Sequence, residues 1–255
     1  MQKALLAGLM VGFMAPLLGI FVVARKASLV ADTFAHTALA GVGLALFLGL
    51  DPIAIAVAAA LLASVGIDRI LEKSRLGVDA IQALFLSGGL ALAVLLAQVK
   101  KTPGMGLEHY LFGSLLTVST QELWFLLACC ISISASVLLN YKVFTALSFN
   151  ESLAQVSGFK VQRAKTFLNA LVALLVASSL KIVGGLLIGA LMVIPVLTAS
   201  RLANSFKGTL FISVLISVFS VILGLLLSYF MDFPPGSAIV LLNIAFFLLF
   251  ARVKV

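Results

Sequence analysis

Long apolar stretches separated by short polar connections dominate the pattern along the chain. A helix needs about 20 apolar residues to cross a hydrocarbon layer of roughly 30 Å, and nine stretches approach or reach that length. They cover residues 4–24, 29–48, 52–67, 78–97, 121–140, 166–180, 183–199, 209–230 and 235–250. Only Lys181 and Ile182 separate the sixth stretch from the seventh, which predicts either a tight hairpin or one partial span. We therefore expect an all-α polytopic membrane protein with eight or nine transmembrane helices.

Composition excludes a water-soluble globular protein. Apolar residues make up 63% of the 255 residues and charged residues only 10%, whereas soluble domains carry about 25% charged residues. No stretch is polar enough to form a separate soluble domain, so we expect residues 1–255 to form one membrane domain. The sequence contains neither a GxxxxGK[ST] phosphate loop nor an HExxH motif. We therefore expect a chain that is not itself an enzyme, and any ATP that drives it would be hydrolysed by another chain.

Basic residues predict the orientation. The net charge is +8, but the basic residues are spread over short connections instead of forming one patch, so nucleic acid is not an expected partner. Placing the C-terminus in the cytoplasm and alternating through nine spans puts thirteen Lys and Arg residues inside and four outside. Because cytoplasmic connections are enriched in Lys and Arg, the N-terminus is expected outside. The four outside residues are Lys3, Lys100, Lys101 and Lys181.

One polar pair lies well inside a predicted span. Asp32 and His36 are four residues apart, so they share a helical face, and charged groups within a membrane are costly enough to mark candidate functional sites. A carboxylate and an imidazole can bind zinc, manganese or iron, relay protons, or simply hydrogen-bond to neighbouring helices. Two ligands are incomplete, and water or other helices would complete the set. The speculative additions are Gln82, Asn169, Met192 and Asn243.

Five other acidic residues lie at span ends, where hydration accounts for them. These are Asp51, Asp68, Asp79, Glu122 and Asp232.

Two connections are long enough for a role of their own. In the cytoplasmic connection, residues 141–165, Asn150 is a suitable helix N-cap and Gly158 a suitable stop, which predicts a short surface helix; an ordinary interfacial loop is the alternative. The external connection, residues 99–120, carries Glu108, His109 and Tyr110, which suit a membrane interface. The acid and the imidazole there contact a metal or a partner, or are simply solvated.

Glycine and proline positions predict close packing of helices. Gly8 with Gly12 and Gly185 with Gly189 form small-residue ridges. Pro195 lies inside the seventh stretch and removes a backbone hydrogen bond, so we expect a kink that takes part in gating or is merely structural. The small residues before it suit the wall of a translocation path.

Four segments together resemble the permease subunit of the bacterial zinc/manganese/iron ABC transporter family, and the resemblance covers essentially the whole chain. Residues 28–42 hold Asp32 and His36 between a Ser-Leu pair and a Gly-Val pair. The other three segments are residues 110–118 (YLFGSLLTV), residues 183–195 followed by 198–202 (TASRL), and residues 232–238 (DFPPGSA). One departure is Asn150, where the family usually has Asp. Asn caps a helix equally well.

The resemblance implies the permease of a type II ABC importer in the bacterial cytoplasmic (inner) membrane. Its implied partners are a second copy of the chain, two cytoplasmic ATPase subunits that bind the ATP, and an extracytoplasmic metal-binding protein. Asp32 and His36 would carry the metal, which is cargo and not a permanent cofactor. Residues of about 149–160 would form the coupling helix, with Asn150, Glu151, Ala154 and Gly158. The region of Glu108, His109 and Tyr110 would receive the binding protein or close the path. The competing interpretation is an ATP-independent, proton-coupled carrier or channel.

Overall fold

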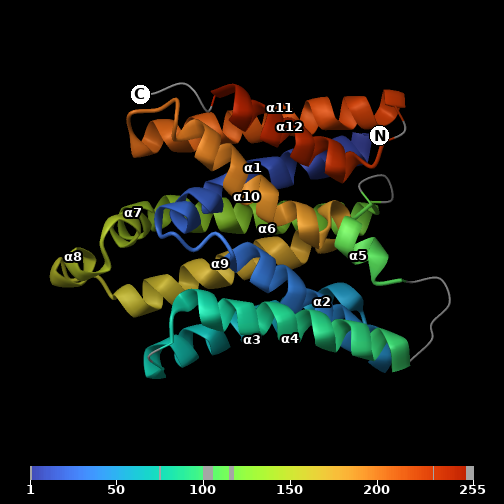
Figure 1. The fold of residues 1–255 in the computed structure, drawn as a ribbon, viewed down its shortest axis with the longest axis horizontal. Helices are drawn as coiled ribbons and strands as arrows, with labels where there is room; N and C mark the ends of the chain where they lie inside the picture. The colour runs from blue at the N-terminus through green and yellow to red at the C-terminus, as the bar shows by residue number, and fades with distance from the viewer. Residues whose placement is uncertain (1, 75, 100–105, 115–117, 232, 251–255) are drawn as a thin grey trace.

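The computed structural model describes residues 2–74, 76–99, 106–114, 118–231 and 233–250. Lys100 and Lys101 of the external connection, residues 115–117 of the external motif and Asp232 of the last motif lie outside this part of the chain. Within it, all regular structure is helical (Figure 1). The helices are α1 (Gln2–Ala24), α2 (Val30–Leu48), α3 (Pro52–Lys73), α4 (Val78–Val99), α5 (Glu108–Phe112), α6 (Thr120–Leu139), α7 (Tyr141–Phe149), α8 (Glu151–Val156), α9 (Val161–Val183), α10 (Gly185–Ala199), α11 (Phe206–Met231) and α12 (Pro235–Phe250).

The expected all-helical polytopic membrane protein is confirmed. Seven of the described helices are long and apolar enough to cross a membrane: α1, α2, α3, α4, α6, α9 and α11. Two further apolar helices, α10 and α12, are shorter. The predicted bounds were too short for α3, which continues to Lys73, and for α9, which begins at Val161. Gly184 alone separates α9 from α10, and its φ of +94° ends one helix before the next begins.

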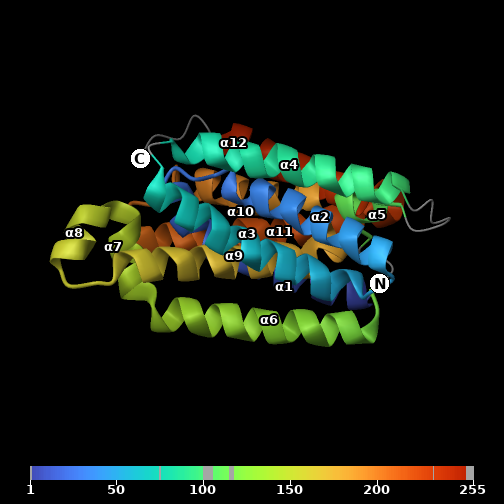
Figure 2. The same cartoon turned by 90° about the horizontal axis from the view of Figure 1, so that it is seen from below.

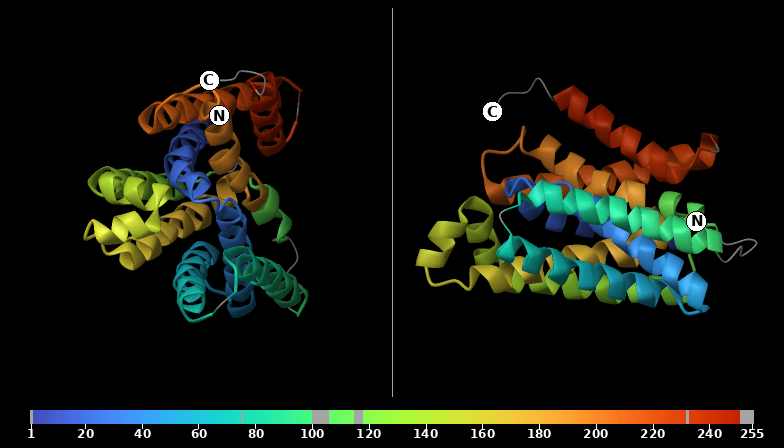
Figure 3. Two further views of the ribbon diagram at one scale, coloured as in Figure 1. Left: turned by 60° about the vertical axis from the view of Figure 1, so that its left-hand side comes forward. Right: turned by 60° about the horizontal axis from the view of Figure 1, so that its bottom comes forward.

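The long helices pack side by side around α1, α2 and α9, which are the most buried (Figure 2). The left view of Figure 3 shows the bundle nearly end-on, with α11 and α12 on one side and α2, α3 and α4 on the other. Glycines permit the closest approaches. A Cβ at Gly12 would lie 3.0 Å from Val221 of α11, and a Cβ at Gly41 would lie 2.8 Å from the carbonyl oxygen of Ile55 in α3. Small residues therefore let α1 pack closely on the Val221 side chain and let α2 contact the backbone of α3.

The connections sort to the two ends of the bundle. The α1–α2, α3–α4 and α10–α11 connections lie at the same end as α7 and α8, whereas α5 and the α2–α3 connection lie at the other (Figure 1). Of the basic residues expected inside, Arg25, Lys26 and Arg201 lie in the first group of connections. The helix order thus brings these three basic residues to one end of the bundle.

A second short helix, α7, precedes the expected surface helix and was not anticipated. Rings from α1, α7 and α11 hold it on the bundle: the ring centroid of Phe21 lies 5.7 Å from that of Phe144 and 5.6 Å from that of Phe206. Phe149, the last residue of α7, also lies 5.6 Å from Phe206. Aromatic contacts at these spacings are favourable beyond the area that they bury, so α7 is a fixed support for α8.

Candidate functional site

Asp32 and His36 lie on one face of α2, and both side chains are partly exposed. The Asp32 carboxylate packs directly against α10 at Gly189, where a Cβ would overlap its Oδ1 atom. Gly189 belongs to the small-residue ridge expected from the sequence. Glycine is needed at this position because any side chain would displace the carboxylate.

The backbone of α2 at His36 lies close to the neighbouring helix α4. A Cβ at Gly89 of α4 would lie 2.8 Å from the carbonyl oxygen of His36, so α4 and α2 approach closely there. Among the described residues, the buried Nδ1 atom of His36 has no hydrogen-bond partner. The unpaired imidazole nitrogen of His36 and the Asp32 carboxylate, one helical turn apart, are suitable ligands for a transition metal.

Gln82 and Asn169 do not lie beside Asp32 and His36. Both line a cavity of about 310 Å³ together with Val30 and Phe34 of α2. Val30 and Phe34 are each two residues from Asp32, which places them about 200° around the helix. The cavity therefore lies behind α2, on the side away from Asp32.

The interpretation of Asp68 as a hydrated span end is wrong. Asp68 is only 2% exposed, and its Oδ1 accepts a hydrogen bond of 2.8 Å from Asn169 Nδ2 of α9. The pair lies close to the cavity behind α2, since Asn169 and Ile67 both line it. A signal was present in the sequence: Ala56, Ala60 and Ala63 begin a face of α3 that returns every three or four residues and reaches Asp68.

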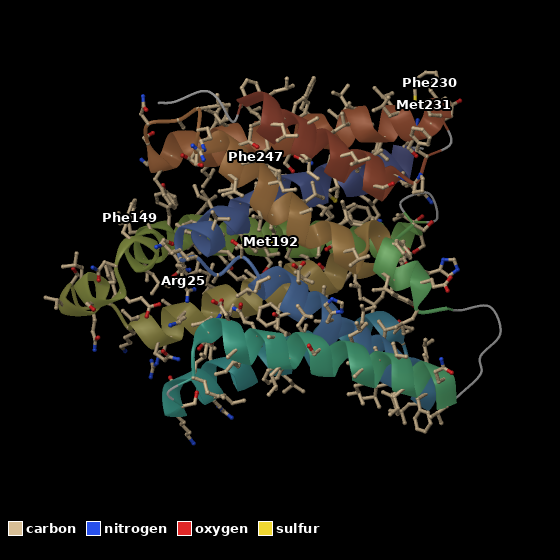
Figure 4. The ribbon with its side chains drawn as sticks, in the orientation of Figure 1. Arg25, Phe149, Met192, Phe230, Met231 and Phe247 are labelled. Atoms are coloured by element: carbon tan, nitrogen blue, oxygen red, sulfur yellow. The ribbon has the colours of Figure 1, made fainter. Side chains whose placement is uncertain are left out.

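The remaining polar and sulfur candidates have structural surroundings. Asn243 accepts from Ser220 Oγ at 3.0 Å and donates to the Ile239 carbonyl at 2.9 Å, so it joins α12 to α11. Met192 is fully buried, and its backbone packs against Gly19 of α1. Figure 4 shows Met192 near the middle of the bundle. The helix α10 continues through Pro195, which is buried, so its gating role stays a prediction.

The expected surface helix is confirmed as α8. The Asn150 side chain accepts from the backbone N–H groups of Ser152 and Leu153 at 2.9 and 3.2 Å, and Gly158 has a φ of +84°. Ala154 is buried, which fixes the side of α8 that faces the protein. Two large apolar side chains of α8, Leu153 and Val156, are exposed, and so is Phe149, the last residue of α7.

Glu151, the first residue of α8, ties this helix to the bundle. Its carboxylate lies 3.0 Å from Lys165 Nζ of α9 and 3.7 Å from Arg25 Nη2, just after α1. Sequence reasoning missed both partners because nothing local relates them to Glu151.

At the other end of the bundle, α5 presents Glu108 and His109 to the outside, whereas Tyr110 is buried. Burial raises the pKa of the Tyr110 phenol. The segment is locked onto the α9–α10 junction because Gly113 and Gly184 contact each other through backbone. Lys181 of α9 forms an ion pair with Glu122 of α6 nearby. Of the three candidate residues in this region, only Glu108 and His109 are available to a partner.

Known proteins are similar to this chain over nearly its whole length. Residues 1–254 match the ABC 3 transport family. The chain is 31% identical, over 98% of its length and 89% of the relative, to the manganese transport system membrane protein MntC of Listeria monocytogenes. It is 30% identical, over 96% of its length and 94% of the relative, to the high-affinity zinc uptake system membrane protein ZnuB of Haemophilus influenzae. The solved structure of PsaBC from Streptococcus pneumoniae in complex with Fab is similar with a TM-score of 0.88 and 32% identity, covering 99% of this chain and 91% of that one.

Proposed function

The chain belongs to the ABC 3 transport family as a membrane permease subunit of an ABC importer of manganese, zinc or iron, and we propose that Asp32 and His36 carry the metal through it. The observation behind this proposal is the pairing of a carboxylate and an unpartnered imidazole nitrogen on one face of a buried apolar helix. A charged group inside a membrane is costly, so its presence there calls for a function.

The small number of ligands suits transport. Among the described residues, no three His, Cys, Asp or Glu side chains gather closely enough to hold a metal ion. A transported ion must bind well enough to enter the path and weakly enough to leave it, whereas a closed tetrahedral site would retain zinc. We therefore propose that the metal is cargo, with water or residues of a second copy completing its coordination, and that no cofactor is bound permanently.

We also propose that residues of about 149–160 are the coupling segment for a separate ATPase. The exposed apolar side chains of Phe149, Leu153 and Val156 project from the end of the bundle. The last two belong to α8, which begins after Asn150 and ends before Gly158. Glu151 and Ala154 hold that helix on the permease. An apolar strip on a helix outside the membrane helices suits a protein groove. This feature favours an ATP-driven importer over an ATP-independent carrier.

The complete assembly that we propose is a type II ABC importer in the bacterial cytoplasmic membrane. Two copies of the chain, each a single membrane domain with α10 and α12 counted among nine spans, would bind two ATPase subunits. The C-terminus and α8 would face the cytoplasm, in keeping with the distribution of basic residues. On the outside, α5 would offer Glu108 and His109 to an extracytoplasmic metal-binding protein, and Tyr110 would fix α5 in place.

The test is cellular metal content, measured by mass spectrometry in a host that lacks zinc and manganese uptake. The host would express the chain with the ATPase and the binding protein, and Asp32→Ala and His36→Ala would be compared with Asp79→Ala, an exposed acid in the first turn of α4. We expect accumulation of a transition metal that both site variants abolish and Asp79→Ala retains, with assembly intact in all. Equal accumulation in Asp32→Ala would contradict the proposed path.

Two further measurements distinguish an ATP-driven importer from an ATP-independent carrier. Accumulation that persists when the ATPase is inactivated would favour the carrier. Glu151→Lys reverses the charge that faces Lys165 and Arg25, so we expect it to weaken copurification of the ATPase.

A further inference from the structure

The short connection between α1 and α2 carries a buried arginine that faces the coupling segment. The Arg25 side chain is 11% exposed, and its Nη2 lies 3.7 Å from Glu151 Oε1 of α8. Burial lowers the pKa of Arg25, while the carboxylates of Glu151 and Asp68 raise it, and a guanidinium stays protonated in proteins. Figure 4 shows Arg25 toward the end of the bundle from which α7 and α8 project. A charged group therefore joins α8 to the connection between α1 and α2.

Backbone hydrogen bonds make this connection tight. Lys26 has a φ of +57°, its N–H donates to Val23 O at 2.9 Å, and the N–H of Ala27 donates to Val22 O at 3.1 Å. The N–H of Val30, the first residue of α2, in turn donates to Ala27 O at 3.1 Å. The first two bonds fasten the connection to the end of α1 and the third fastens it to α2, so a displacement of Arg25 is passed to the first turn of α2 as well as to α1.

The first half of α2 has open space behind it and a tight contact in front. The cavity of about 310 Å³ is lined by Arg25, Val30, Phe34 and Gln82, among others, whereas Asp32 on the opposite face packs against Gly189. Because protein interiors are normally filled to crystal-like density, this cavity gives α2 room to move away from α10.

The cavity walls also carry unused hydrogen-bonding groups. Gln82 is 2% exposed and its Oε1 has no partner among the described residues, and the same holds for the buried Nε of Arg25. Buried polar groups are nearly always paired. A second arrangement of α2 and Arg25 can therefore be stabilised by contacts that this arrangement leaves open.

We propose that Arg25 is a positioning residue that transmits movement of α8, through Glu151, to α2 and so changes the packing of Asp32 against Gly189. Small displacements of packed helices of this kind are an established route for switching between two states. The inference rests on the proposed function, since it takes α8 as the contact with the ATPase.

The experiment measures manganese transported per ATP hydrolysed in vesicles that contain the complete complex with its ATPase and binding protein. Arg25→Gln removes the charge, and Arg25→Lys keeps it. Lys165→Gln is the matched control because it removes the shorter ion pair of the same Glu151 carboxylate, at 3.0 Å, but from α9. We expect Arg25→Gln to lower transport per ATP at least tenfold with ATPase copurification and ATP hydrolysis within twofold of wild type. Arg25→Lys should stay within threefold, and Lys165→Gln within twofold.

Several results would overturn the inference while leaving the proposed function intact. Equal losses in Arg25→Gln and Lys165→Gln would mean that Glu151 only anchors α8, and unchanged transport per ATP in Arg25→Gln would remove Arg25 from the path. If Arg25→Gln gives no intact complex, Glu151→Gln tests the same link from a side chain that is 47% exposed, and unchanged transport per ATP there refutes it. Absence of metal transport by the wild-type complex would instead count against the proposed function.

Discussion

The contact between Asp32 and Gly189 allows the proposed metal path to be tested by adding a single methyl group at Gly189. In Gly189→Ala, the new Cβ would overlap Asp32 Oδ1 and lie 3.1 Å from the carboxylate carbon, whereas carbon atoms in good contact are about 3.5–4.0 Å apart. Either the carboxylate rotates away from α10, or α10 separates from α2. The first change moves the Asp32 carboxylate relative to His36, and the second opens the contact that holds the carboxylate in place.

The size of the effect follows from two opposing contributions. Inserting a methyl group into a filled contact costs about 1–3 kcal/mol, and replacing glycine by alanine inside a helix returns roughly 0.5–1 kcal/mol. We expect a net destabilisation of roughly 1–2 kcal/mol, which lowers the melting temperature but leaves the protein folded. Because the carboxylate is one of two proposed ligands, metal uptake should fall at least tenfold.

The assay combines metal uptake with thermal unfolding of the purified complex. Gly88→Ala on α4 is the matched control, since a Cβ there would meet nothing within 4 Å, and it should match wild type in uptake. In the double variant Gly189→Ala with Asp32→Ala, the overlap is gone, so the melting temperature should return to that of Asp32→Ala alone, without uptake. Wild-type uptake and stability in Gly189→Ala would refute the assigned geometry of Asp32.

Three further predictions concern the supports of the site. Asn169→Ala removes the hydrogen-bond donor to buried Asp68 and should destabilise the protein by about 1–3 kcal/mol. Its melting temperature should therefore be lower than that of the control Asn204→Ala, which changes an exposed residue. Equal melting temperatures would contradict the pairing. Asn150→Ala removes the acceptor for two N–H groups of α8, costing about 1 kcal/mol, so ATPase copurification should weaken, while Asn150→Asp should retain it. Gly184→Ala places a Cβ at a φ of +94° and 2.7 Å from Gly113 N, so it should lower the melting temperature. The control Gly66→Ala, whose new Cβ would have its nearest neighbour at 3.9 Å, should not. Unchanged stability in Gly184→Ala would contradict the packing of α5 on the α9–α10 junction.

Hydropathy and a few local signals were sufficient for much of the architecture. The long apolar helices follow from the length of the apolar runs, because backbone groups in a membrane must be satisfied within a helix. The surface helix α8 was predictable because its cap, Asn150, lies within three residues of the N–H groups that it accepts from. The Asp32 and His36 pair was also visible, since two polar side chains four residues apart share a face whatever the helix packs against.

The sequence left open the surroundings of each helix. In a membrane, residues that face lipid and residues that face other helices are both apolar, so hydropathy did not reveal that Asp68 is buried against Asn169 or that α7 is held by aromatic rings of α1 and α11. The sequence alone thus determined the membrane class and the long helical segments, and it proposed the candidate metal ligands. Only the tertiary structure decided which glycine lies against Asp32, which cations meet Glu151 and where α2 has room to move, because these contacts join residues from different helices.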